Sequence, residues 1–272
     1  MKFENSLHEN TKFLNFKSKI WENITNESEA KIKSEPLLKN FLSSYILNIN
    51  DFQSALIHYL TSLLKDNSTS ELELTKIIAE CYEKNPYISD LAISDLQAIK
   101  SRDSACKDWI SPFLYYKGFH ALQFYRVANW LWEKGRLEYA FFIQSQVSRI
   151  FGIDIHPAAK ISHGIMLDHG TGIVIGETSV VEENVSIMQS VTLGGTGKDT
   201  EDRHPKIGSG VLIGPGSKIL GNIKIGKGSK IVAGSVVLSD IPPHSLVAGV
   251  PAKVIGKPNE EVPSLIMNQK PN

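Results

Sequence analysis

The sequence of 272 residues has little cysteine, no net charge and no long hydrophobic run, and each absence narrows the possible fold and function. Two cysteines, Cys81 and Cys106, allow at most one disulfide, and we expect both as reduced, buried thiols of a cytoplasmic protein. Lysine and arginine total 29, as do aspartate and glutamate, so the overall charge attracts neither nucleic acid nor a membrane. The N-terminus lacks the apolar core of a signal peptide, and no segment approaches a membrane span.

Glycine is nearly absent from the first 150 residues, where only Gly118 and Gly135 occur. Apolar residues recur in this part at helical spacing, for example over 55–60 and 121–126. We therefore predict an α-helical N-terminal domain over residues 1–150. Its helices can cover one open end of the domain that follows.

A six-residue repeat runs from Ile155 to Ile255. Two aliphatic rows keep the period, with Ser179 as a small exception, and one row resumes in a new phase after a break: Ile155, Ile161, Leu167, Ile173, Val185 and Val191; Ile175, Val181, Ile187 and Leu193; and Ile207, Ile213, Ile219, Ile225, Ile231 and Val237. Between the aliphatic residues lie turns with glycine or asparagine. Such units stack into a parallel β-helix whose aliphatic rows point inward.

The alternative is a parallel sheet of an α/β fold, but its crossovers need about a dozen residues, for which the repeat leaves no room. Leu193 and Ile207 are 14 residues apart, two more than two repeats, so a segment between them must leave the regular path. We predict an α+β protein in which the helical domain precedes a β-helix domain over 151–258. An extruded loop covers about 195–206, and 259–272 form a C-terminal tail.

Polar strings interrupt the repeat, and two more lie in the helical part: Asp154-Ile155-His156-Pro157-Ala158-Ala159, Leu167-Asp168-His169-Gly170-Thr171-Gly172, Val191 to Lys198, Asp202-Arg203-His204-Pro205-Lys206-Ile207, Asp95-Leu96-Gln97-Ala98-Ile99, and Tyr116 to Gln123. Together they closely resemble the serine O-acetyltransferase family of hexapeptide-repeat acyltransferases, over roughly residues 35–258. The resemblance implies a left-handed β-helix. It also implies acetyl transfer from acetyl-CoA to the hydroxyl of L-serine, giving O-acetyl-L-serine and CoA as the first step of cysteine biosynthesis, without a metal.

Direct acetyl transfer to a hydroxyl needs a base that takes the hydroxyl proton as the new bond forms, and a neutral imidazole suits this task. The resemblance assigns the base to His169 and the carboxylate that orients it to Asp154. It places His204 beside the reacting carbonyl, where the imidazole can stabilise the developing oxyanion.

An amino-acid acceptor carries an ammonium and a carboxylate, so its site should offer anions and a cation. The resemblance implies that Asp95 and Asp168 hold the amino group and that Arg203 holds the carboxylate, with its neighbour His204 also at the substrate. The planar guanidinium of arginine suits a carboxylate because it can donate two parallel hydrogen bonds. Arg203 and His204 lie in the insertion that breaks the repeat, and loops on rigid scaffolds often carry function.

Acetyl-CoA needs a long groove with small residues beside the pantetheine arm and cations near the phosphates. The resemblance places it along the edge of the solenoid between two subunits, at Gly195, Thr196, Gly214, Gly216, Lys230 and Ala233, with Lys253 as a further phosphate partner. Pro215 departs from the family pattern, because a small residue with a backbone N–H is expected there.

A groove shared between subunits implies a homo-oligomer, and the family forms trimers or dimers of trimers. L-cysteine is the expected feedback inhibitor. Many members also insert a C-terminal isoleucine into O-acetylserine sulfhydrylase. This chain ends in Lys270-Pro271-Asn272, which argues against that complex.

Three other functions fit the repeat. A hexapeptide acetyltransferase acting on a sugar or an antibiotic shares the solenoid, but the Asp95 and Arg203 pattern favours an amino-acid acceptor. A γ-type carbonic anhydrase needs three imidazoles on one zinc ion, for which His156, His163 and His169 are the candidates. A non-catalytic regulatory scaffold is the third alternative. The presence of His169 and Asp154 argues against it, because a scaffold would not need them.

Overall fold

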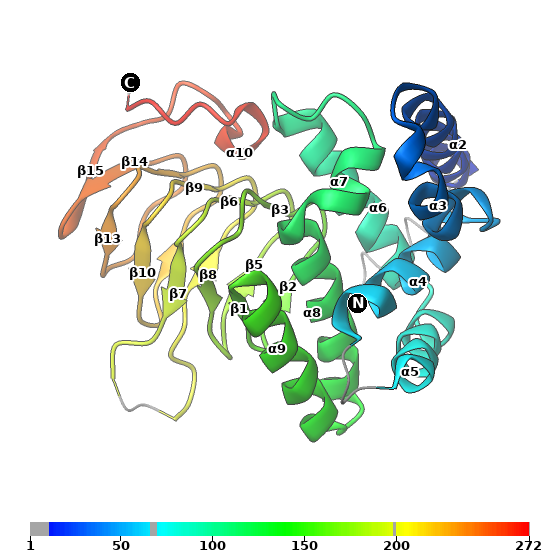
Figure 1. The fold of residues 1–272 in the computed structure, drawn as a ribbon. Coiled ribbons are helices and arrows are strands. Elements are labelled where there is room, and N and C mark those ends of the chain that lie inside the picture. Colours follow the sequence, from blue (N-terminus) through cyan, green and yellow to red (C-terminus); the bar gives the residue numbers. More distant parts are fainter. Residues whose placement is uncertain (1–10, 66–69, 198–199, 272) are drawn as a thin grey trace.

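The chain forms a helical half followed by a parallel β-solenoid (Figure 1). The structure is a computed structural model, which describes residues 11–65, 70–197 and 200–271. The predicted fold class is therefore confirmed. The helices are α2 (Thr11–Ser34), η1 (Pro36–Leu38), α3 (Lys39–Leu42), η2 (Ser43–Leu47), α4 (Phe52–Leu64), α5 (Glu71–Lys84), α6 (Tyr87–Arg102), α7 (Ile110–Tyr115), α8 (Lys117–Glu133), α9 (Leu137–Phe151) and α10 (Pro263–Ile266). The strands are β1 (Ile153–Ile155), β2 (Lys160–Ile161), β3 (Met166–Leu167), β4 (Ile173–Ile175), β5 (Val180–Val181), β6 (Ser186–Ile187), β7 (Thr192–Gly194), β8 (Lys206–Ile207), β9 (Leu212–Ile213), β10 (Lys218–Leu220), β11 (Lys224–Ile225), β12 (Lys230–Ile231), β13 (Val236–Val237), β14 (Leu246–Gly249) and β15 (Ala252–Gly256).

Local sequence signals set the limits of several helices. Asp51 caps α4, because its carboxylate accepts the backbone N–H of Ser54 at 2.9 Å. At the C-terminus of α9, Gly152 adopts a left-handed conformation with φ 65°, which glycine reaches without a steric penalty. The next residue, Ile153, begins the first strand of the solenoid.

The solenoid is a three-sided prism whose strands pair in parallel, except for β15, the antiparallel edge strand of the six-stranded sheet. The five-stranded sheet has the order β1-β4-β7-β10-β13, the four-stranded sheet β11-β8-β5-β2, and the six-stranded sheet β15-β14-β12-β9-β6-β3. Successive coils are held in register by strand pairing, and Val174 pairs with Thr192, three six-residue repeats later. Both aliphatic rows of the repeat point inward and are buried, apart from the partly exposed Ile161, which confirms the interpretation of the period.

The expected extruded loop lies between β7 and β8. Val180 pairs with Lys206, 26 residues further on, whereas Lys206 pairs with Lys224 after only 18 residues. The coil that contains the loop is therefore longer than a regular coil, and the loop projects away from the prism (Figure 1).

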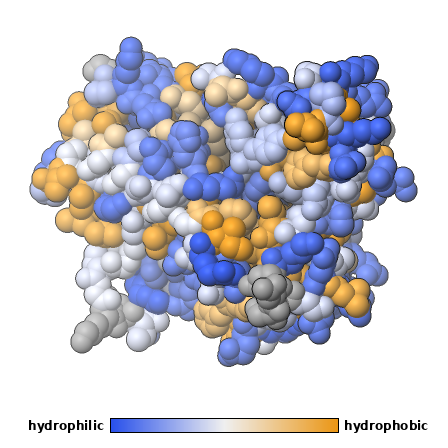
Figure 2. Space-filling view, in the orientation of Figure 1, coloured by the Kyte–Doolittle hydropathy of each residue, from blue (hydrophilic) through white to orange (hydrophobic). Residues whose placement is uncertain are grey.

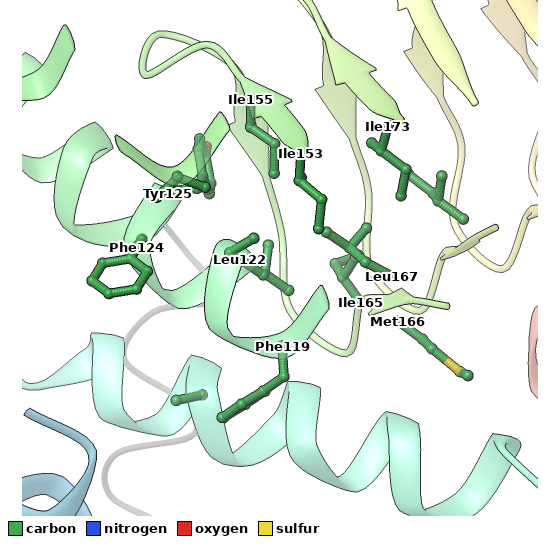
Figure 3. Packing of buried hydrophobic residues seen from close by; sticks show 14 of the residues in the cluster. Phe119, Leu122, Phe124, Tyr125, Ile153, Ile155, Ile165, Met166, Leu167 and Ile173 are labelled. Atoms are coloured by element: carbon green, nitrogen blue, oxygen red, sulfur yellow. The ribbon is translucent and has the colours of Figure 1, made fainter. Parts of the chain in front are cut away.

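Helices α8 and α9 cover the open N-terminal end of the solenoid (Figure 1). In Figure 3 the side chain of Leu122 from α8 lies beside those of Ile153 and Leu167 from the first coil, whereas the ring of Phe119 points away from them. Gly118 permits this close approach, because a Cβ there would lie 2.1 Å from the carbonyl oxygen of Leu167. One continuous core therefore links the two halves, and α8 is fixed against the strand that leads to His169.

At the other end of the solenoid, β15 pairs antiparallel with β14 and the tail returns along the six-stranded sheet to α10, which packs near α6 (Figure 1). The face seen in Figure 2 mixes hydrophilic and hydrophobic residues. Within the described ranges, every helix is too short or too polar to cross a bilayer. Cys81 and Cys106 are both free and buried.

Candidate functional site

Most of the predicted site residues lie along two edges of the prism, at either side of the five-stranded sheet. The His169 edge comprises the turns that lead into this sheet, at residues 168–172, 188–191, 214–217 and 232–235. The His204 edge comprises the turns that leave it, at 156–159 and 176–179, together with the loop from 195 to 205. The sheet between the two edges exposes an outward row through Asp154, Val174, Thr192 and Lys218, whose strands pair in that order.

A cavity of about 460 Å³ opens at the His169 edge, where the solenoid meets the helical half. It is lined by Ile99, Asp103, Ala105, Tyr115, Tyr116, Lys117, Gly118, Met166, Leu167, Asp168 and His169. The cavity thus combines two carboxylates and an imidazole with apolar and aromatic walls, a composition typical of small-molecule sites.

His169 stands at the rim of this cavity on a backbone of positive φ, 54°, which is uncommon for a residue other than glycine. Its side chain is 74% exposed, and its Nε2 lies 3.9 Å from Oδ1 of Asp168. Non-glycine residues with positive φ often occur at functional sites, where the surrounding structure holds them. Here the conformation presents the imidazole to solvent beside the cavity.

The two carboxylates of the cavity influence each other. Burial, and then the charge of Asp103, raise the pKa of Asp168, while His169 lowers it. Burial and the Asp103 carboxylate also raise the pKa of Tyr116, whose phenol hydrogen-bonds Asp103. A bound cation would relieve the repulsion between Asp103 and Asp168.

Asp95, which was predicted to bind the substrate amino group, lies in a buried ion pair and not in the cavity. Its carboxylate is fully buried and accepts hydrogen bonds from Nε and Nη2 of Arg126, at 3.1 and 2.6 Å, and from the backbone N–H of Ile165. Asp95 is absent from the cavity lining, whereas Asp103, just beyond the end of α6, lines the cavity beside Asp168.

His204 lies at the other edge, buried in the loop and 7% exposed. Its Nδ1 accepts the backbone N–H of Thr178 at 3.2 Å and lies 3.0 Å from the Thr178 hydroxyl. Since Nδ1 is an acceptor, the neutral ring carries its proton on Nε2. Burial, and then the Arg203 guanidinium, lower the pKa of His204, so the ring is neutral at neutral pH. The ring is therefore a hydrogen-bond donor through Nε2.

Arg203 forms an ion pair with Glu177 in the turn below it, at 2.6 Å. Its other terminal nitrogen donates to the carbonyls of Thr200 and Glu201 in its own loop. The hydrogen bond from Arg203 lowers the pKa of Glu177. Glu177 and Thr178, which the sequence analysis did not single out, therefore hold the two loop residues Arg203 and His204.

Asp154 lies on the sheet between the edges, and its Oδ1 accepts a hydrogen bond of 2.7 Å from Gln144 of α9. Among the hydrogen bonds of the described residues, none joins Asp154 to His169. The nearest carboxylate contact of His169 is the one with Asp168. The orienting role of Asp154 stays a prediction.

The residues predicted for acetyl-CoA divide between the two edges. Gly214, Gly216 and Ala233 stack above His169 at its edge, where a Cβ on Gly214 would lie 2.6 Å from the Ala233 nitrogen. Gly195 and Thr196 begin the loop at the His204 edge, and Lys253 is exposed on β15. The backbone oxygen of Pro215 accepts the Gly234 N–H at 2.8 Å.

Lys230, a predicted phosphate partner, is buried in this chain. Its side chain is 1% exposed, and its Nζ donates to the carbonyl of Lys270 at 2.6 Å and lies 4.0 Å from Glu260. The C-terminal tail covers the outer face of β12, so a residue that looks solvent-facing in the repeat becomes buried.

The three histidines proposed for zinc lie at different corners of the first coil, after β1, β2 and β3. His156 packs edge-on against Trp132 and Phe141, with ring centroids 5.2 and 5.6 Å away, and His163 lines a separate hollow beside α8. These imidazoles do not converge within one chain. Across the described ranges, no group of three or more His, Cys, Asp or Glu side chains is placed to hold a metal ion.

Comparison with known proteins gives one consistent result. The family model described as "Serine acetyltransferase, N-terminal" matches residues 20–124, and that of the bacterial transferase hexapeptide repeats matches 204–239. The serine acetyltransferase of Salmonella typhimurium is 51% identical over 250 residues, 92% of either chain. A solved serine acetyltransferase in complex with cysteine has a TM-score of 0.91 at 48% identity, over 93% of this chain and 99% of that one. The Brucella abortus serine acetyltransferase in complex with coenzyme A has a TM-score of 0.86 at 48% identity, over 88% and 96%.

Proposed function

This chain belongs to the serine acetyltransferase family, whose members are transferases with acetyl-CoA as co-substrate, and from that premise we propose how its two edges perform the reaction. The reaction moves an acetyl group from acetyl-CoA to the hydroxyl of L-serine and leads into cysteine biosynthesis. The observation that carries the proposal is the cavity in which Asp103, Asp168 and His169 meet.

Asp103 and Asp168 bind the ammonium of L-serine. Both carboxylates line the cavity, and the raised pKa of Asp168 reflects burial and the nearby charge of Asp103. An ammonium between them would neutralise the repulsion and replace lost water with charge-assisted hydrogen bonds. The apolar residues Ile99 and Met166 on the cavity wall leave little to bind a larger polar acceptor such as a hexose.

His169 is the general base. Its imidazole takes the proton of the serine hydroxyl while the oxygen attacks the thioester carbonyl carbon, forming a tetrahedral intermediate. The C–S bond then breaks, and the imidazolium returns the proton to the departing sulfur, giving O-acetyl-L-serine and CoA. Base catalysis of this kind contributes about 10²–10⁴-fold to the rate. We assign Asp154 to orient His169 in the assembled enzyme.

His204 stabilises the oxyanion through its Nε2–H, and Arg203 binds the substrate carboxylate. The hydrogen bonds from Thr178 to Nδ1 support the required tautomer, and the lowered pKa of His204 keeps the ring uncharged before the reaction. A neutral donor aimed at the developing charge is the usual arrangement of an oxyanion site. On substrate binding, the Arg203 guanidinium would leave Glu177 and bind the substrate carboxylate, or would donate N–H groups to both carboxylates.

Two neighbouring subunits form each active site. His169 and His204 lie at opposite edges of one sheet, whose outward row includes Val174, an aliphatic side chain that is 38% exposed. In a cyclic trimer the His169 edge of one subunit meets the His204 edge of the next, and the ring closes. Acetyl-CoA then lies in the groove between the edges, against Gly195 and Thr196 on one side and Gly214, Gly216 and Ala233 on the other.

L-cysteine is the proposed feedback inhibitor. It carries the same ammonium and carboxylate as L-serine, so the same charges can hold it, and a relative has been solved in complex with cysteine. Inhibition should therefore be competitive with L-serine.

The test is thiol release from acetyl-CoA, measured for the wild type and for His169→Ala. Acceptors are L-serine, D-serine, L-homoserine, a hexose and chloramphenicol. We expect release with L-serine only, and a loss of about 10²–10⁴-fold in the variant, the usual contribution of a general base. Release with the hexose or chloramphenicol alone would move the chain to another hexapeptide acetyltransferase, and full activity of His169→Ala would remove the base assignment.

A further inference from the structure

The loop residues Arg203 and His204 rest on a three-residue turn that follows β4, namely Gly176, Glu177 and Thr178. The turn lies about 26 residues earlier in the chain and contacts the loop through hydrogen bonds. Glu177 pairs with the Arg203 guanidinium, and Gly176 lies directly beneath the His204 ring.

Thr178 makes the most contacts of the three. Its Oγ1 accepts the backbone N–H of Arg203 and that of His204, each at 3.0 Å. These two bonds use both acceptor positions of the hydroxyl, whose own proton is shared between His204 Nδ1, at 3.0 Å, and the carboxylate of Asp202. The backbone N–H of Thr178 is directed at the same Nδ1, at 3.2 Å.

Gly176 restricts the ring from the other side. A Cβ at this position would lie 2.1 Å from both Cδ2 and Nε2 of His204, so the ring occupies the space that any other residue would need. The φ of Gly176 is not in the left-handed region, so glycine is required there for space rather than for backbone freedom. Ring and turn therefore fit together in one orientation.

We propose that Thr178 is a positioning residue for acetyl transfer, which fixes His204 as the Nε2–H tautomer and sets the backbone of Arg203 and His204 in the loop. The hydroxyl does not touch the reacting atoms. It acts through His204, whose Nε2 donor must already be directed when charge develops on the carbonyl oxygen. Its catalytic consequence rests on the proposed function, whereas the tautomer assignment does not.

Three variants of Thr178 separate the hydroxyl from the shape of the side chain. Thr178→Val keeps the branched shape and removes the hydroxyl, Thr178→Ser keeps the hydroxyl and removes the methyl, and Thr178→Ala serves if the valine variant does not fold or assemble. Solid-state ¹⁵N NMR of histidine-labelled protein reports the tautomer, with His204→Asn identifying the His204 signals. Circular dichroism and mass measurements control for folding and assembly.

We expect Thr178→Ser to keep the Nε2–H signal and nearly all activity. In Thr178→Val or Thr178→Ala the backbone N–H of residue 178 still points at Nδ1, so Nε2–H should remain the main form and an Nδ1–H signal should appear beside it. The kcat with L-serine should fall about 10- to 100-fold, less than the roughly 100- to 1,000-fold for outright removal of an oxyanion donor. The KM for acetyl-CoA should stay unchanged, since Thr178 is not in the proposed groove.

An unchanged tautomer and unchanged kcat in both hydroxyl-free variants would overturn the inference. So would equal losses in the serine and valine variants, because shape rather than the hydroxyl would then matter. A wild-type protein that does not acetylate L-serine would refute the proposed function instead, and the NMR comparison would still test the tautomer.

Discussion

Asp95 and Arg126 form an ion pair of 2.6 Å in which both side chains are almost completely buried, 0% and 3% exposed. Arg126 also donates to the carbonyl of Ser162 at 2.9 Å, and the other oxygen of Asp95 accepts the backbone N–H of Ile165. This network joins α6 and α8 to the first coil of the solenoid. It therefore holds together the two halves whose junction forms the cavity beside His169.

Asp95→Asn should destabilise the protein by about 3–5 kcal/mol, because removing one partner leaves the Arg126 charge buried without compensation. Chemical denaturation followed by circular dichroism measures the loss. Asp51→Asn is the matched control, since asparagine is as good an N-cap as aspartate. A variant as stable as the wild type would mean that the buried pair contributes little.

Asp103→Asn should instead leave stability nearly unchanged and raise the KM for L-serine. One of the two carboxylates that face the ammonium would be neutral, and losing a charge-assisted hydrogen bond of about 1.5–3 kcal/mol corresponds to roughly 10- to 100-fold weaker binding. Steady-state kinetics with acetyl-CoA at saturation give the value. If Asp95→Asn raised this KM and Asp103→Asn did not, the original assignment of Asp95 would be restored.

The contrast between Asp95 and Asp103 shows where sequence reasoning succeeds and fails. The solenoid was predictable, because inward aliphatic residues must recur at each coil, and they do from Ile155 to Val237. Whether a helical aspartate faces a cavity or a buried arginine depends on packing between segments that are distant in sequence. Asp103 offered a weak signal, since it directly follows the basic end of α6.

Two other differences have the same origin. Lys230 follows the outward pattern of its strand, and only the return of the tail buries it. In the sequence, Glu177 and Thr178 have the pattern of ordinary turn residues, and only the contacts with Arg203 and His204 of the loop show that they support it. The six-residue repeat predicts contacts between neighbouring coils well. It does not predict the contacts of segments outside the repeat, such as the loop and the C-terminal tail.

Lys230 and Lys253 should therefore respond differently to substitution. Lys253→Ala should raise the KM for acetyl-CoA if this exposed ammonium meets a phosphate, with little change in stability. Lys230→Ala should lower stability, because it removes the hydrogen bond to the Lys270 carbonyl and the ionic contact with Glu260. Thermal unfolding and acetyl-CoA kinetics, measured on both variants, distinguish the two cases. A KM effect confined to Lys230→Ala would indicate that the tail moves aside for the co-substrate.

His120 should make the fold sensitive to acid. Burial lowers its pKa to about 4, and its Nε2 lies 2.9 Å from the carbonyl oxygen of Phe113. The unfolded chain, with a histidine pKa near 6.5, binds more protons than the folded chain between about pH 4 and 6.5, so stability falls as the pH drops through this window. From pH 7 to pH 5 the loss should be about 2 kcal/mol.

His120→Gln keeps a donor for the Phe113 carbonyl and removes the titration. Denaturation of wild type and variant at pH 7 and pH 5 should show a smaller loss for the variant. Equal losses would assign the acid sensitivity to other groups.

Mixing two inactive variants tests whether each active site is shared between subunits. His169→Ala inactivates one edge and His204→Ala the other, so the assembly formed by either variant alone should release little thiol. When the two variants are co-expressed in equal amounts and assemble at random, about a quarter of all sites should be intact. An intact site needs a wild-type His169 from one chain and a wild-type His204 from its neighbour, and each has a chance of about one half. If both histidines acted within a single chain, no combination would restore a site, and the mixture would be as inactive as its components. Purified variants that are mixed after assembly are the control, and they should gain activity only as fast as subunits exchange.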